Sequence, residues 1–193
     1  MTGEVLWSQH IASPSANNET LYSIAGDSQG NALIAGRWYN GATLDDIVVM
    51  KLDAGDGHTL WQSLIDGAGH LDDRGWFLQV GPDDQPVVTG FTPTSPTEAA
   101  FYVAKLRNSD GGTIWARTLP GAIMNPEDRS GWLAVLDGGD VVLCNKTWSS
   151  SSSYDVILHR FAAANGADVW HVQYNSGGTA ADEPRAMIRD GTG

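Results

Sequence analysis

Acidic residues recur at one phase of this sequence, about a dozen residues after each of four evenly spaced tryptophans. Carboxylate oxygens are the ligands that Ca²⁺ prefers, and two opposed carboxylates can also act as the acid and base of a glycosidase. A structural role is the third interpretation, because Asp73 and Asp128 can accept backbone hydrogen bonds or pair with Arg74 or Arg129. Asp73 and Asp128 are the candidate Ca²⁺ ligands. The acidic residues at this phase are Glu19, Asp72, Asp73, Glu127, Asp128, Asp182 and Glu183.

Aromatic residues follow the second expected strand of each repeat. Exposed aromatic rings beside carboxylates and hydroxyls can stack on the apolar face of a sugar, whereas rings that pack under their own loops serve structure. The sequence therefore predicts a surface for a glycan or a protein ligand. Its candidate residues are Trp38, Tyr39, Phe91, Trp148, Asp73, Asp128 and Asp182.

Other patterns that carry chemistry are missing. The sequence has no Gly-x-Ser-x-Gly motif, no P-loop and no dinucleotide-binding glycine fingerprint. Its five histidines share no metal-ligand spacing, and Cys144 is the only cysteine, which excludes an intrachain disulfide and a thiolate metal cluster. No catalytic residue is predicted, and the only cofactor considered is Ca²⁺.

The composition excludes several classes of protein. The chain has 193 residues and carries 11 Lys and Arg against 23 Asp and Glu, a net charge of −12. Such an acidic chain repels the phosphates of nucleic acids. No apolar stretch approaches the roughly 20 residues of a membrane-spanning helix. The 23 glycines disfavour helix interiors, so a helical bundle is not expected.

The elements that must position these residues repeat along the chain. Trp7, Trp61, Trp115 and Trp170 are 54, 54 and 55 residues apart and close the similar phrases GEVLW, GDGHTLW, DGGTIW and ANGADVW. A basic residue lies ten residues before each of the last three. The repeats cover residues 7–60, 61–114 and 115–169, with a partial repeat at 170–193.

Each repeat contains four short runs rich in β-branched and aromatic residues, separated by Gly, Asp and Asn turns. In the first repeat they are Thr20–Ala25, Ala32–Gly36, Ile47–Leu52 and Thr59–Ile65, which predicts a four-stranded antiparallel meander. The third run is apolar on both faces and so belongs to a sheet between two other sheets. The predicted fold is a β-propeller of four-stranded blades, about 3.5 repeats of ~54 residues, with the tryptophans packed between blades.

The phrases KLDAGDGHTLW and KLRNSDGGTIW resemble the turn-and-tryptophan signature of propellers with pyrroloquinoline-quinone-like repeats. The pattern SIAGDSQGNALIAG followed by DDIVVMKLDAGDG is similar to the bacterial secreted β-propeller repeat families. The resemblance covers essentially the whole chain. It implies a non-catalytic binding or interaction scaffold with an extracellular or periplasmic location. The alternative is an enzyme fragment, either a quinoprotein dehydrogenase or a propeller glycosidase or lyase.

Loop lengths alternate along each repeat. The connections between first and second runs and between third and fourth runs are tight, whereas the other two classes are long. Both long classes emerge on one side of a blade, which makes that side the predicted ligand surface. The long connections are expected at Arg37–Asp45, Phe91–Ala100, Lys146–Ser153, Asp66–Asp72, Pro120–Glu127 and Asn175–Ala181.

The ends of the chain contain incomplete repeats. We expect an outer strand around Trp7, and an outer strand followed by one inner strand from Trp170 onward. Three and a half repeats do not close a ring of four to eight blades. The remaining blades are therefore expected from a longer parent chain or from another copy.

Overall fold

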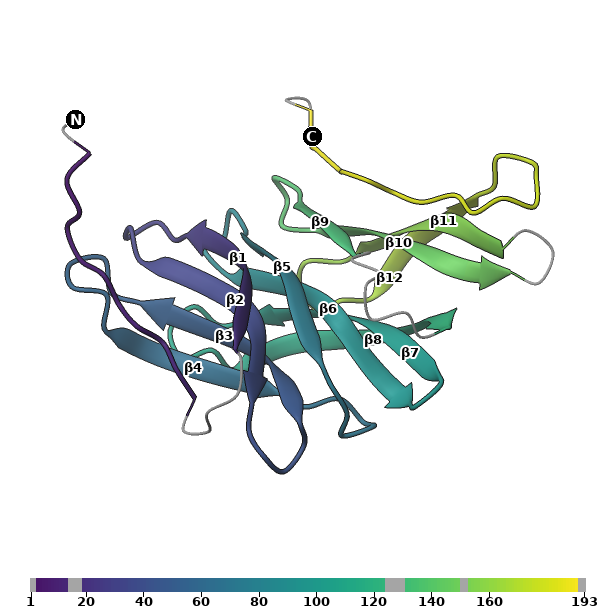
Figure 1. The fold of residues 1–193 in the computed structure, drawn as a ribbon. Coiled ribbons are helices and arrows are strands. Elements are labelled where there is room, and N and C mark those ends of the chain that lie inside the picture. The colour runs from purple at the N-terminus through teal and green to yellow at the C-terminus, as the bar shows by residue number, and fades with distance from the viewer. Residues whose placement is uncertain (1–2, 14–18, 124–130, 150–152, 191–193) are drawn as a thin grey trace.

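The computed structural model describes residues 3–13, 19–123, 131–149 and 153–190, and every regular element in them is a β-strand (Figure 1). Twelve strands form three antiparallel sheets of four. The first contains β1 (Thr20–Gly26), β2 (Ala32–Tyr39), β3 (Asp45–Leu52) and β4 (Thr59–Ile65). The second contains β5 (Arg74–Val80), β6 (Pro86–Ser95), β7 (Glu98–Leu106) and β8 (Thr113–Ile123). The third contains β9 (Trp132–Val135), β10 (Val141–Ser149), β11 (Ser153–Phe161) and β12 (Asp168–Tyr174).

These sheets are the predicted blades, and the all-β class and four-stranded meanders are confirmed. The four strands expected in the first repeat are all present, with β2 and β3 extended by a few residues. The strand β3 is buried along its whole length, as expected of a strand between two sheets. Among the described residues, no helix is long and apolar enough to cross a membrane.

Side chains between neighbouring sheets form the core. One apolar cluster joins the first and second blades, with Val49 and Trp61 on one side and Val88 on the other. A second cluster joins the second and third blades through Trp115 and Phe161. The inner strands β1, β5 and β9 lie next to one another in order, so the blades stand side by side (Figure 1).

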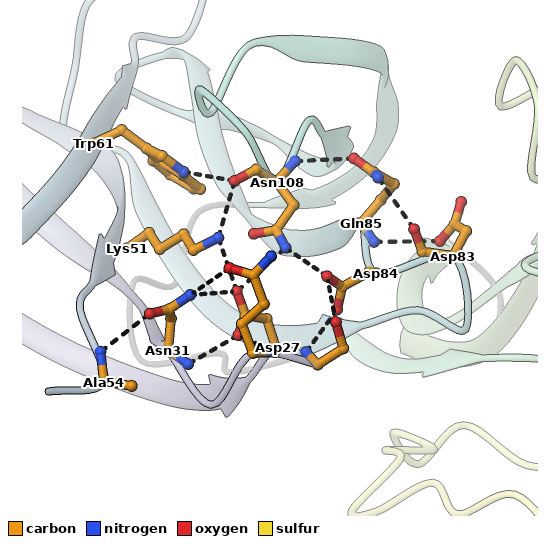
Figure 2. A network of polar contacts seen from close by, with 11 residues as sticks. Asp27, Asn31, Lys51, Ala54, Trp61, Asp83, Asp84, Gln85 and Asn108 are labelled. Atoms are coloured by element: carbon orange, nitrogen blue, oxygen red, sulfur yellow. Dashed lines mark hydrogen bonds and ion pairs between the residues drawn. The ribbon is translucent and has the colours of Figure 1, made fainter.

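At one end of the blades, which we call the turn side, three of the four repeat tryptophans reach the following blade. The indole Nε1 of Trp61 donates a hydrogen bond to the carbonyl of Asn108 at 2.9 Å, and the Lys51 ammonium donates to the same oxygen at 3.3 Å (Figure 2). The Trp61 ring lies against Gly111, whose φ is +73° and whose Cβ, if present, would be 2.6 Å from the ring. We call this arrangement the tryptophan latch.

The latch occurs at three positions along the chain. Trp7 donates to the Ala54 carbonyl at 3.0 Å, and Trp115 donates to the Ala163 carbonyl at 3.0 Å. Their rings lie against Gly57 and Gly166, both with positive φ. Lysine and tryptophan reach one carbonyl because they are direct cross-strand neighbours, which explains their ten-residue spacing.

A buried ion pair supports the turn side. The Lys51 ammonium lies 2.8 Å from Asp27 Oδ2, and both side chains are buried. Burial would raise the pKa of Asp27, but hydrogen bonds from Lys51 and Asn31 outweigh it and hold the pKa well below its usual range. Figure 2 shows Asp27 and Asp84 converging on the Asn108 side chain.

Several expectations about strands and loops are wrong. The loops expected at Lys146–Ser153 and Pro120–Glu127 start later than predicted, because β10 continues to Ser149 and β8 to Ile123. Residues 3–13, around Trp7, form no strand, although Trp7 makes its latch. The described residues after β12, 175–190, also form no strand. The expected long loop at Phe91–Ala100 is a hairpin in which β6 and β7 continue to a two-residue turn, because the two strands stay paired as far as Ser95 and Glu98.

Trp170 differs from the other three tryptophans. It lies on β12, whose residues are all exposed, and its own side chain is 40% exposed. Within the described residues no latch is formed by Trp170. Trp170 therefore serves as a control for measuring how much the latch contributes to stability.

Candidate functional site

The opposite end of the blades, which we call the loop side, brings three carboxylates together. The connection from β4 to β5 runs back to the start of β3, where the Asp73 amide donates a hydrogen bond to the Asp45 carbonyl at 2.6 Å. This contact places Asp73 beside Asp46 and Asp66. One carboxylate oxygen from each of the three lies within 4.8 Å of the others. We call this set the Asp46–Asp66–Asp73 cluster.

Two of the three carboxylates are inside the protein. Asp73 is 0% exposed and Asp46 is buried. The loop between β2 and β3 holds Asp46, which accepts hydrogen bonds from Asn40 Nδ2 and, at 2.7 Å, from Thr43 Oγ1. Burial raises the pKa of Asp46, and the neighbouring Asp66 carboxylate adds to that effect.

Asp73 is the least compensated member of the cluster. Its Oδ2 accepts a hydrogen bond from the Gly67 amide, whereas no described residue donates a hydrogen bond to its buried Oδ1. Burial raises the pKa of Asp73 to about 7, and the negative charges of Asp66 and Asp46 contribute in the same direction. This is a carboxylate whose negative charge needs a further partner.

A small apolar cavity lies beside the cluster on the loop side. Its volume is about 270 Å³, and it opens between the first two blades. The β2–β3 loop, the β4–β5 connection and the β6–β7 hairpin all contribute to its wall. The lining residues are Leu44, Leu71, Asp72, Arg74, Phe91, Pro93 and Pro96.

The four predicted aromatic residues do not form one exposed surface. Trp38 and Phe91 are candidates for this surface, and both are buried, in agreement with the alternative in which the rings pack under their loops. Trp38 packs against Val48 and Met50 of β3. Phe91 stacks on Trp76 with a centroid distance of 5.7 Å and also lines the cavity.

The other predicted aromatic residues lie in two different blades. Tyr39 is half-buried at the end of β2. Trp148, on β10 of the third blade, is exposed and contacts Tyr154 edge-on at a centroid distance of 5.2 Å. Their role in binding a ligand stays a prediction.

The predicted acidic residues are distributed over separate junctions. Asp182 lies in the segment after the third blade. Its carboxylate accepts hydrogen bonds from the Ser176 amide at 2.8 Å and from the Ser176 hydroxyl at 2.7 Å. Asp73 belongs to the junction of the first and second blades. Glu127 and Asp128 lie outside the described residues.

Sequence reasoning missed Asp46 and Asp66 as partners of Asp73. Asp46 is the second residue of β3 and Asp66 directly follows β4. Alignment of the repeats pairs them with Asp155 and Asn175. This alignment could have identified the cluster from the sequence, because it shows that a position with an amide in one repeat, Asn175, has a carboxylate in another, Asp66.

No protein-family model matches the sequence, and no curated protein matches it significantly. Among solved structures, BamB from Moraxella catarrhalis is similar with a TM-score of 0.50 and 16% identity, over 83% of this chain and 40% of BamB. A protein of unknown function from Bacteroides caccae aligns with a TM-score of 0.47 and 9% identity, over 83% of this chain and 63% of that protein. The chain thus spans less than two thirds of either. The similarity to BamB supports the β-propeller fold. Membership of one repeat family stays a prediction.

Proposed function

We propose that this chain is a non-catalytic binding scaffold that contacts a protein ligand on its loop side. The observation that carries the proposal is the apolar cavity between the first two blades, which is formed by loops on a rigid β framework. The resemblance to secreted repeat propellers supports an extracellular or periplasmic location for this interaction.

The cavity favours a protein over a glycan. Two of the four aromatic residues expected to stack on sugars are buried, and the remaining two lie in different blades. A volume of about 270 Å³ is at the lower limit for small-molecule sites. It is suited to one apolar anchor side chain of a larger partner, the kind of contact that dominates protein interfaces.

Charge favours a basic partner segment. The chain has a net charge of −12, and a negative surface attracts and orients positively charged ligands. Within the cavity wall, Asp72 is exposed whereas Arg74 is half-buried. We therefore propose a peptide segment with an apolar anchor flanked by Lys or Arg.

Selection from a random peptide library displayed on phage tests this proposal. Leu44, at the rim of the cavity, is 41% exposed, and Leu60, on β4, is 43% exposed, so the two leucines form a matched pair. Leu44→Asp suits the positive φ of +65° at that position, which Asp tolerates better than most residues.

We expect selected peptides to bind the wild-type chain and the Leu60→Asp variant equally. Binding to the Leu44→Asp variant should be about tenfold weaker or more, because one anchor contact contributes more than 1.4 kcal/mol. Failure to enrich any peptide, or enriched peptides that bind Leu44→Asp as well as the wild type, would refute the proposal.

A further inference from the structure

The loop side contains one junction twice, and the two copies differ in their hydrogen bonding. Aligned by the repeat, Asp46, Asp66 and Asp73 correspond to Asp155, Asn175 and Asp182. The backbone contact is the same in both copies, since the Asp182 amide donates to the Tyr154 carbonyl at 2.6 Å as the Asp73 amide does to Asp45.

In the third-blade copy, each carboxylate oxygen of the aligned pair has a donor. Asp155 accepts from Asn175 Nδ2 at 2.9 Å and from Gln173 Nε2 at 2.7 Å. Asp182 accepts from the amide and the hydroxyl of Ser176. Side-chain amides, a hydroxyl and a backbone amide therefore supply hydrogen bonds to all four of these oxygens.

In the first-blade copy, the corresponding donors are replaced. Asp66 takes the place of Asn175 and brings a third carboxylate in place of an amide donor. Gly67 takes the place of Ser176, so the hydroxyl that would bind the second oxygen is missing. Asp73 Oδ1 is consequently buried with no donor among the described residues, in a residue that is 0% exposed.

We infer that the Asp46–Asp66–Asp73 cluster is a binding site for a hard divalent cation, Ca²⁺. Two oxygens bound to one Ca²⁺ at 2.3–2.6 Å can be at most about 5 Å apart, and one oxygen from each of the three carboxylates lies within 4.8 Å of the others. Ca²⁺ accepts six to eight oxygens, so water completes the coordination. The cation supplies the positive partner that Asp73 Oδ1 lacks.

The charges around the cluster leave it negative. His70 contacts Asp66 Oδ2 at 2.5 Å from the exposed side, and Asp72 adds a further carboxylate next to Asp73. Arg37 is directed to another acid, Asp45, at 2.9 Å. A cation bound here joins the start of β3 to the β4–β5 connection, close in sequence to Leu44 and Leu71 of the cavity.

Isothermal titration calorimetry with CaCl₂ on the EDTA-treated full chain tests the inference directly. We expect one Ca²⁺ per chain with a Kd of about 10⁻⁴–10⁻³ M, the range of extracellular calcium modules, and a melting temperature that rises with Ca²⁺ concentration. The readout needs no peptide ligand, so it stands or fails separately from the proposed function.

Asp66→Asn is the sharpest variant, because it recreates the amide of Asn175 and should preserve the fold. It should weaken Ca²⁺ binding about tenfold or more, as should Asp73→Asn. Asp56→Asn is the control, since Asp56 belongs to an exposed acidic group on the turn side, and its affinity for Ca²⁺ should equal that of the wild type.

Three results would overturn the inference: no binding by the folded wild-type chain up to about 10 mM Ca²⁺, undiminished binding by both Asp66→Asn and Asp73→Asn, or loss of binding in Asp56→Asn. Circular dichroism of each variant establishes that it is folded. If Asp73→Asn fails to fold, Asp66→Asn alone decides the outcome.

Discussion

The two ends of the blades differ in how closely the repeats resemble one another. On the turn side, three tryptophans make the same hydrogen bond to the same position of a blade, over a glycine with positive φ each time. On the loop side, equivalent positions hold Asp66 in one blade and Asn175 in another. Contacts that repeat stabilise the fold, and the position where the repeat is broken is where a ligand can bind.

Two buried carboxylates show the same difference. Asp27, on the turn side, has a buried lysine and two amide donors, and its pKa is strongly lowered. Asp73, on the loop side, has two carboxylate neighbours, and its pKa is raised to about 7. Both are shielded from water, so the neighbouring groups decide the sign of the pKa shift.

The largest expected effect is the loss of a latch. Trp61→Ala removes a ring packed between two blades and its hydrogen bond to Asn108, and should lower the free energy of unfolding by about 3–5 kcal/mol. Trp170→Ala is the matched control, because Trp170 is 40% exposed, and it should cost much less. Urea denaturation measures both. Equal losses in the two variants would show that the latch contributes nothing specific.

The buried ion pair should have the next largest effect. Asp27→Asn leaves the Lys51 ammonium without its anion and should cost about 3 kcal/mol at pH 7. The pKa of Asp27 is lower in the folded state, so its stabilising contribution is present above the usual carboxyl pKa of about 3.9 and is lost as the pH falls below that value. The difference in the free energy of unfolding between wild type and variant should therefore become smaller below about pH 4. A difference that stays constant down to pH 2 would contradict the assignment.

The smallest effect on stability is expected for Asp73→Asn. This substitution should stabilise the protein at high pH, whereas the two preceding ones destabilise it. The pKa of Asp73 is raised to about 7 in the folded state, so its favourable contribution is present below about pH 4 and is lost as the pH rises through 7. In EDTA at pH 8, Asp73→Asn should be more stable than the wild type by about 1–2 kcal/mol, and the advantage should disappear at pH 4.

Thermal unfolding at both pH values measures the effect at Asp73. Asp182→Asn is a suitable comparison, since hydrogen bonds from Ser176 lower the pKa of Asp182 at the equivalent position, and the variant should gain no stability at high pH. An Asp73→Asn variant less stable than the wild type at pH 8 in EDTA would contradict the raised pKa.

Much of the fold could be predicted from the sequence, because each blade is a local unit. Strand runs such as Ile47–Leu52 show their burial in their own hydrophobic pattern, and their turns are marked by Gly, Asp and Asn. The spacing of Lys51 and Trp61 follows from their opposition in one strand pair. The hairpin at Phe91–Ala100 was mistaken for a loop because its Thr and Pro residues are typical of loops, whereas pairing between β6 and β7 overrides that preference.

The candidate site could be predicted only in part. Asp73 is marked by its place in the repeat, but its contact with the start of β3, where Asp46 lies, forms only when the β4–β5 connection folds back onto that strand. Neither the burial of Trp38 and Phe91 nor the position of Asp46 follows from local periodicity, since both depend on which loops cover the strand ends. The repeat in the sequence determines the blades and their order, because strand pairing and the latch act between neighbours. Only the tertiary structure brings Asp73 to Asp46 and Asp66, because that contact depends on the path of the β4–β5 connection rather than on any periodic pattern.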